Sequence, residues 1–129
     1  MTTFAPHLFV KIVSDAIDFY RAAFDAVEHR RWSNPDGSVH VVEMTIHGAL
    51  FHVHEERANA AQLSPETLKA TSSQIGIFDD DPDGLFNSAV AAGGRVVSPM
   101  QDFDYGYRQG VVADPFGHQW LVQKRIPTA

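Results

Sequence analysis

Hydrophobic and polar positions alternate along most of the chain in short runs, and turn residues separate these runs. Residues 4–12 are apolar and rich in strand formers, and Ser14 then offers an N-cap for a helix over residues 15–26. Apolar residues recur along that helix at helical spacing: Ile17, Tyr20, Phe24 and Val27. The pattern predicts a strand followed by a helix that lays one apolar stripe on a sheet.

Three more strands are predicted to complete the first half of the chain, over residues 28–33, 39–46 and 49–54. The first two are separated by Asn34-Pro35-Asp36-Gly37, where proline fixes one φ and glycine accepts a positive one. His47-Gly48 forms the shorter second turn. The first half therefore reads βαβββ.

The second half repeats this order after a polar stretch that contains one short helix over residues 65–70. The elements expected there are a strand over 74–78, a helix over 83–92 and strands over 95–98, 108–114 and 119–124. A repeat of this length is typical of two copies of one supersecondary unit. We predict an α+β fold in one domain: module one at about 4–56, a linker at about 57–72 and module two at about 73–125.

Composition narrows the class of protein. The 129 residues are 44% hydrophobic and 20% charged, as in ordinary globular domains. The formal net charge of −6 and the scattered basic residues disfavour a nucleic-acid partner. Cysteine is absent, which removes disulfides, thiolate nucleophiles and zinc–thiolate sites. No signal-like start and no apolar run of about 20 residues is present, so we expect a cytoplasmic protein without a membrane segment.

Two stretches of the sequence carry a resemblance to a known family. One runs from Phe9-Val10 through residues 15–24, and the other is Asp114-Pro115-Phe116-Gly117-His118-Gln119-Trp120. They resemble the glyoxalase/bleomycin-resistance/extradiol-dioxygenase superfamily, also called vicinal oxygen chelate proteins, and its PhnB-like branch most closely. The resemblance covers nearly the whole chain. It implies two curved mixed sheets around a cavity, commonly formed across a homodimer with exchanged modules.

The resemblance also implies four metal-ligand positions, one on the first and one on the last strand of each module. Alternation along the first strand points His7 to the cavity together with Phe9 and Lys11, and we match Gln74 to His7 in module two. The first-strand ligand candidates are therefore one imidazole and one amide.

Counting four residues on from the turn glycines Gly48 and Gly117 gives His52 and Leu121 as the last-strand positions. Leucine cannot ligate a metal, so we expect either no metal or a weakly bound divalent ion such as Zn, Ni, Co, Fe or Mn. His7 and His52 are then either ligands or neutral residues that line the pocket.

Other residues are candidates for binding or catalysis. If Glu43, in mid-strand, faces the cavity, it is either a candidate acid or base or the partner of His40 or Arg108; if it faces solvent, it is only a charged strand residue. We expect residues 101–110 to form an aromatic loop, which is either a ligand lid or a surface that packs on the dimer partner. The expected pocket residues are Phe9, His54, Tyr105, Tyr107, Arg108 and Leu121. We expect His29, His40 and His47 to be solvated, and His118 to hydrogen-bond the backbone.

Three functions agree with these features. The first is a homodimer that binds or sequesters a small molecule without a complete metal site. The second is a metal-dependent lyase, isomerase or dioxygenase. The third is a regulatory or interaction module with a vestigial pocket. The ligand cannot be read from the sequence, because this fold hosts many chemistries.

Overall fold

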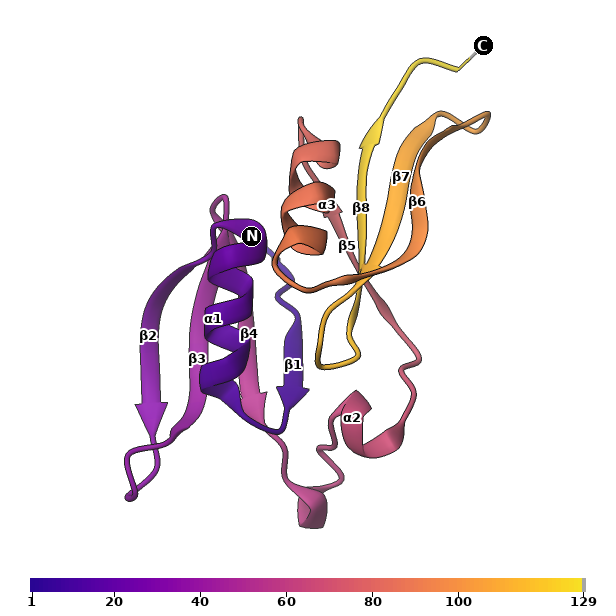
Figure 1. Cartoon of the computed structure of the whole chain (residues 1–129). Helices are drawn as coiled ribbons and strands as arrows, with labels where there is room; N and C mark the ends of the chain where they lie inside the picture. Colours follow the sequence, from indigo (N-terminus) through magenta and orange to yellow (C-terminus); the bar gives the residue numbers. More distant parts are fainter. Residues whose placement is uncertain (129) are drawn as a thin grey trace.

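In the computed structural model, which describes residues 1–128, the chain forms two βαβββ modules joined by a linker (Figure 1). Module one contains β1 (His7–Val10), α1 (Val13–Phe24), β2 (Val27–Ser33), β3 (Val39–Ile46) and β4 (Ala49–Glu55). The linker contains η1 (Ala58–Ala60) and α2 (Pro65–Leu68). Module two contains β5 (Gln74–Phe78), α3 (Pro82–Ala91), β6 (Arg95–Phe103), β7 (Tyr107–Ala113) and β8 (Gln119–Arg125).

Both modules build the same mixed sheet. The strand orders are β1-β4-β3-β2 and β5-β8-β7-β6, and in each sheet the first and last strands of the module pair in parallel. The remaining neighbours are antiparallel. Helix α1 packs on the first sheet, and α3 packs on the second. Within residues 1–128, none of the helices has the length and apolar character that a bilayer crossing requires.

Side-chain alternation assigns the two faces of each sheet. In β1, Leu8 and Val10 are buried on the helix side, whereas His7 is exposed on the other face. In β8, Trp120 and Val122 are buried on the helix side. We call the face of each sheet that points away from its helix the open face.

Several predicted boundaries are wrong. Helix α1 begins at Val13 with Ile12 as its N-cap, and no side chain caps it, so Ser14 is not the cap. The largest correction concerns residues 101–110, which were expected to be a loop. Strand β6 continues to Phe103 and β7 begins at Tyr107, so the segment is a hairpin with a tight turn at Gly106 (φ +92°). Irregular pairing of β6 with β7 between Val96 and Gln101 breaks the alternation that would have revealed this strand.

A buried carboxylate joins the two modules. Asp114 is only 5% exposed, and its Oδ2 accepts hydrogen bonds from Tyr20 Oη at 2.6 Å and Trp120 Nε1 at 3.0 Å. Its Oδ1 accepts from the backbone N–H groups of Phe116 and His118 at 3.0 and 2.9 Å. Burial, followed by the charge of Asp114, holds the pKa of Tyr20 well above its ordinary value, so the phenol keeps its proton.

Three further hydrogen bonds connect the modules. His118 Nε2 donates to the Phe9 carbonyl at 2.9 Å, which confirms the backbone role expected for this histidine. His47 Nδ1 donates to Asp79 Oδ2 at 2.7 Å. Ser88 Oγ of α3 donates to the carbonyl of Ala22 in α1 at 3.2 Å, where the two helices pack together. The two modules therefore share one continuous apolar core.

Replacing Tyr20 with phenylalanine should lower the free energy of unfolding by roughly 1.5–3 kcal/mol, because a buried charged acceptor loses a donor. Urea denaturation of wild type and Tyr20→Phe measures this difference. Tyr105→Phe is the matched control, because the Tyr105 hydroxyl is exposed and only accepts a hydrogen bond from Gln109. Equal, small losses in both variants would show that the Asp114 contact does not hold the modules together.

Candidate functional site

The open face of the first sheet brings together most of the residues predicted for module one. His7 pairs with His52 in the register of β1 and β4, and Phe9 pairs with His54. Glu43 of β3 pairs with His52 on the other side of β4. Neighbouring strands thus place imidazoles, a ring and a carboxylate on one surface.

Three histidines on this face are in mutual contact, and we call His7, His52 and His54 the histidine cluster. The rings of His7 and His52 stack with centroids 4.4 Å apart and planes 4° from parallel. His7 Nδ1 and His54 Nε2 are 2.8 Å apart, so one nitrogen donates a hydrogen bond and the other accepts it. Glu43 Oε2 lies 3.5 Å from His52 Nε2. The partner of Glu43 is therefore His52, and neither His40 nor Arg108 fills that role.

The cluster disfavours its own protonation. Burial, followed by the charge of His52, lowers the pKa of His7. Burial also lowers the pKa of His54, with the nearby positive charges of His7 and His52 as the next causes. A second charge among stacked imidazoles would repel the first, so both groups favour the neutral form with a free ring lone pair.

The donors needed for the implied four-position metal site are present in module one alone. Sheet register pairs Gly76 with Leu121 in module two, as it pairs His7 with His52 in module one. Gly76, and not Gln74, is therefore the counterpart of His7. A Cβ at position 76 would lie 3.1 Å from Gln123 Nε2, so a larger residue there would press on that amide.

Gln74 lies one pleat away from that position, beside Gln119, and its Nε2 donates to Gln119 Oε1 at 3.1 Å. Across residues 1–128, no three side chains of His, Cys, Asp or Glu have a geometry that would hold a metal ion. His52 Nδ1 is buried and has no hydrogen-bond partner within residues 1–128. These residues do not complete the implied ligand set.

The open face of the second sheet is aromatic and carries a cation. The Phe78 and Tyr107 ring centroids are 6.0 Å apart, and Tyr105 is 5.9 Å from Tyr107 and 5.0 Å from Phe103. The Arg125 guanidinium lies 4.5 Å from the centre of the Phe78 ring. This face can stack a planar group and pair with an anion.

Arg108 is not on this face, contrary to the expectation from the sequence. It alternates with Tyr107, so its guanidinium lies on the helix side. It donates to Asp83 of α3 at 2.7 and 2.6 Å, and to Asp102 at 2.9 Å. The hydrogen bonds to Asp83 and Asp102 raise the pKa of Arg108. The hydrogen bond from Arg108 lowers the pKa of Asp83. Arg108 is a structural residue that ties α3 to the β6–β7 hairpin.

Sequence reasoning missed Arg125 and Trp32. Arg125 follows Leu121 by four residues on β8, so the same alternation that selected Leu121 would have selected it had the strand been extended past residue 124. Trp32 lies on the open face of β2, and the Arg30 guanidinium lies 4.6 Å from the centre of its ring. Of the histidines expected to be solvated, His29 and His47 are exposed and His40 is half-buried. Each also has a hydrogen-bond partner: Thr45 for His29, Arg57 for His40 and Asp79 for His47.

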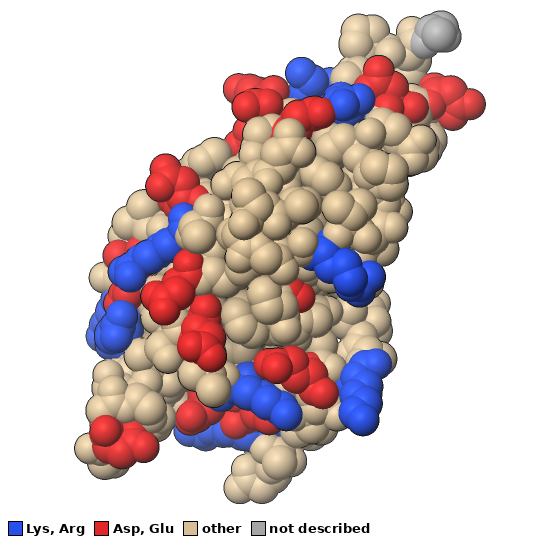
Figure 2. All heavy atoms as spheres, viewed as in Figure 1, with Lys and Arg blue, Asp and Glu red and all other residues tan. Residues whose placement is uncertain are grey.

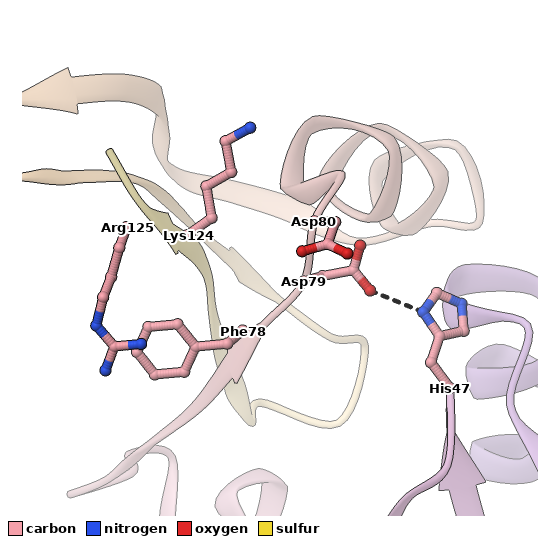
Figure 3. A pocket seen from close by; sticks show the side chains of 6 residues that line it. All are labelled: His47, Phe78, Asp79, Asp80, Lys124 and Arg125. Atoms are coloured by element: carbon pink, nitrogen blue, oxygen red, sulfur yellow. Dashed lines mark hydrogen bonds and ion pairs between the residues drawn. The ribbon is translucent and has the colours of Figure 1, made fainter. Parts of the chain in front are cut away.

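Two cavities lie near the seam between the modules. One of about 620 Å³ is mainly apolar and lined by the N-terminal segment, the β3–β4 turn, β5 and Trp120. The other, of about 430 Å³, lies at the end of β5 beside Phe78 and Arg125 (Figure 3). On the face drawn in Figure 2, Lys and Arg are scattered among Asp and Glu around an uncharged centre.

The family assignment follows from a match over most of the chain. The model of the Glyoxalase/Bleomycin resistance protein/Dioxygenase superfamily matches residues 3–122. The chain belongs to this superfamily. An uncharacterized protein of Mycobacterium bovis is 39% identical over 125 residues, which cover 95% of this chain and 82% of that superfamily relative. An uncharacterized protein of Mycobacterium tuberculosis has the same identity, with 74% of its length covered.

Solved structures share the fold of this superfamily member. TioX from Micromonospora sp. ML1 matches with a TM-score of 0.75 at 22% identity, covering 98% of this chain and 100% of TioX. A gene product of Arabidopsis thaliana has a TM-score of 0.73 at 26% identity, with coverages of 97% and 98%. FosX of Listeria monocytogenes, a fosfomycin resistance protein solved with Mn(II), has a TM-score of 0.69 at 17% identity, with coverages of 99% and 92%.

Acidification from about pH 7.5 to 5 should destabilise the protein through His7 and His54. The unfolded chain takes up protons near the ordinary histidine pKa of about 6.5, whereas the folded cluster resists them. Their contribution is full above that pH and is lost as the pH falls through the lowered folded pKa values. His54→Gln should therefore make the urea midpoint less dependent on pH.

The matched control for this measurement is His29→Gln, which removes an imidazole outside the cluster. The pH dependence expected for His54→Gln is weaker than in both the control and wild type. If the three proteins respond identically to pH, the cluster does not resist protonation.

Proposed function

We propose that the protein binds a small organic molecule in a cavity formed between the open sheet faces of two copies of the chain. The observation that carries this proposal is the apolar surface that one chain leaves in water. The exposed fractions are 53% for Val27, 38% for Trp32, 41% for Leu50, 50% for Phe78 and 55% for Tyr105. All five side chains belong to the open faces or to the hairpin turn beside them, and surfaces of this kind mark binding sites.

A second copy is the proposed cover because, among residues 1–128, the helices of the two modules pack on the other sides of the sheets. The modules of one chain meet through α1 and α3, which lie on the opposite sides of the sheets. A two-fold axis would set the first sheet of each copy against the second sheet of the other, and would close both surfaces at once. The histidine cluster and the aromatic face would then line the same cavity.

The proposal places the chain among members of the superfamily that bind a ligand without a complete metal site. Its support is the chemistry of the donor set, since Gly76 and Leu121 stand where module one has His7 and His52. The turn motif over residues 114–120 and the turn over residues 34–37 support assignment to the PhnB-like branch. Scattered surface charge supports a partner that is neither nucleic acid nor membrane.

A divalent-metal enzyme is the second candidate. It is favoured by the contact between His7 and His52 and by their preference for the neutral form, which is the form that ligates metals. FosX, which shares the fold, was solved with Mn(II) and a dihydroxypropylphosphonic acid. Against it, Leu121 supplies neither a ligand nor a base. Within residues 1–128, Glu43 beside His52 is the one open-face carboxylate in contact with the cluster.

Dimerisation and ligand binding should both be visible through Trp32, because it lies on an open face whereas Trp120 is fully buried. Sedimentation equilibrium should give a dimer at micromolar concentration. Acrylamide should quench Trp fluorescence less at higher protein concentration, because the partner covers Trp32 in the dimer. Compounds that raise the melting temperature in a screen of small organic molecules should change Trp emission.

Trp32→Phe is the control for this experiment, because it leaves only the buried Trp120 as a fluorophore. In that variant neither dimerisation nor a bound compound should alter quenching. A stable monomer at micromolar concentration would overturn the dimeric cavity. Compounds that change the emission of wild type and Trp32→Phe equally would place the binding site elsewhere.

The purified protein should contain no metal or well below one ion per chain, because the module-two positions carry either an apolar side chain or none. Leu121→Glu should increase the affinity for Ni²⁺, Co²⁺ or Zn²⁺, measured by calorimetry, by adding a carboxylate opposite the imidazoles. The increase should fade as the pH falls below the ordinary histidine pKa of about 6.5 and through the lowered pKa values of His7 and His54, because a protonated imidazole cannot ligate a metal.

The control for this gain is Leu121→Gln, which has a similar shape but no charge. A tightly held metal in every wild-type chain would favour the enzyme over the binding protein. A gain in affinity that survives His7→Ala would show that the added carboxylate acts away from the cluster.

A further inference from the structure

The open face of module two contains a cation stacked on aromatic rings, and we call Arg125, Phe78 and Tyr107 the arginine stack. The Arg125 guanidinium lies 4.5 Å from the Phe78 ring centre and 5.9 Å from that of Tyr107. Figure 3 shows the guanidinium against the Phe78 ring. Both residues border the cavity of about 430 Å³ at the end of β5.

The guanidinium has hydrogen-bonding capacity that the protein does not use. Within residues 1–128, no carboxylate lies within 4 Å of Arg125, whereas Arg108 on the helix side is held by Asp83 and Asp102. Stacking on a ring uses the flat face of a guanidinium and leaves its in-plane N–H donors free. These donors match the two oxygens of a carboxylate.

The formal charges of the two carboxylates and two cations that line the cavity balance, so the contacts of each carboxylate decide whether Arg125 is paired. Asp79 is committed elsewhere, since it accepts from His47 at 2.7 Å and from the backbone N–H of Asp81 at 2.8 Å. Figure 3 shows its carboxylate directed toward His47 and away from Arg125. Asp80 also lines the cavity, but within residues 1–128 it makes no ion pair with Arg125, so the guanidinium is the unpaired charge of the arginine stack. An anion is therefore favoured over a cation at the arginine stack.

We propose that the arginine stack is a subsite for the carboxylate of a planar aromatic acid. The carboxylate accepts two hydrogen bonds from Arg125, and the ring of the ligand lies against Phe78 and Tyr107 on the open face. This inference rests on the proposed function, because it names the ligand class of the cavity proposed between two copies of the chain, one wall of which is the open face of module two. It makes Arg125 the residue that selects for charge and Phe78 a residue that selects for planarity.

Three probes separate charge from planarity: 2-naphthoate, the neutral 2-naphthalenemethanol and the non-aromatic cyclohexanecarboxylate. Calorimetry or NMR titration of the wild-type protein should show naphthoate binding at least about 10-fold more tightly than either of the others. Arg125→Gln should remove the advantage of naphthoate over naphthalenemethanol and leave the neutral probe unchanged. Arg125→Lys, which keeps the charge but not the planar donor pair, should give an intermediate loss.

Two more variants should change probe affinity in opposite directions. Phe78→Leu should weaken both aromatic probes and leave cyclohexanecarboxylate unchanged, whereas Asp80→Asn should tighten naphthoate binding by removing a nearby negative charge. Arg95→Gln is the matched control, because it removes one positive charge from the far end of the same sheet. Its affinity for naphthoate should equal that of wild type.

The inference is overturned if naphthoate and naphthalenemethanol bind wild type equally, or if Arg125→Gln and Arg95→Gln behave alike. It is also overturned if no probe binds while compounds detected through Trp32 still do, and in that case the cavity itself stands. If neither the probes nor any screened compound binds the dimer, the proposed function fails as well.

Discussion

The structure depends on one buried carboxylate that the two modules share. Taking an ionised Asp out of water costs several kcal/mol unless its oxygens are fully hydrogen-bonded. Asp114 meets this requirement with four donors, of which only Tyr20 comes from module one. Tyr20 lies on α1, which follows directly from β1, so this bond also fixes where β1 and its His7 lie relative to module two. A contact on the helix side of the sheets thus helps to set the geometry of the candidate site on the open faces.

The sequence predicts the order of elements well because two signals coincide in it, a change of hydrophobic period and explicit turn residues. Residues 74–78 and 39–46 were assigned with the bounds that the structure has. The site was predicted less well for a specific reason. Gln74 was matched to His7 by its place at the start of a strand, yet Gly76 is the true counterpart, because strand register is set by pairing with β8. A one-pleat offset of this kind is invisible without the neighbouring strand.

The two modules share a backbone plan but have different chemistry on their open faces. Module one carries neutral-leaning imidazoles beside Glu43, which suits proton exchange or polar recognition. Module two carries stacked rings with the Arg125 cation, which suits a flat anionic group. A metalloenzyme would extend the imidazole pair of module one to four ligands. At the matching positions, module two has Gly76 and Leu121. Repetition of the fold has therefore not meant repetition of the site.

The turn between β3 and β4 has a strained backbone, and a contact with module two helps to offset the strain. His47 adopts a left-handed conformation (φ 47°), which costs a residue other than glycine roughly 1–2 kcal/mol. Glycine or asparagine would form this hairpin more readily, but neither could reach Asp79 with an imidazole. The hydrogen bond from His47 to Asp79 offsets part of this cost, and it forms only when the second module is docked. A contact of this kind couples the hairpin of one module to the other and favours their unfolding together.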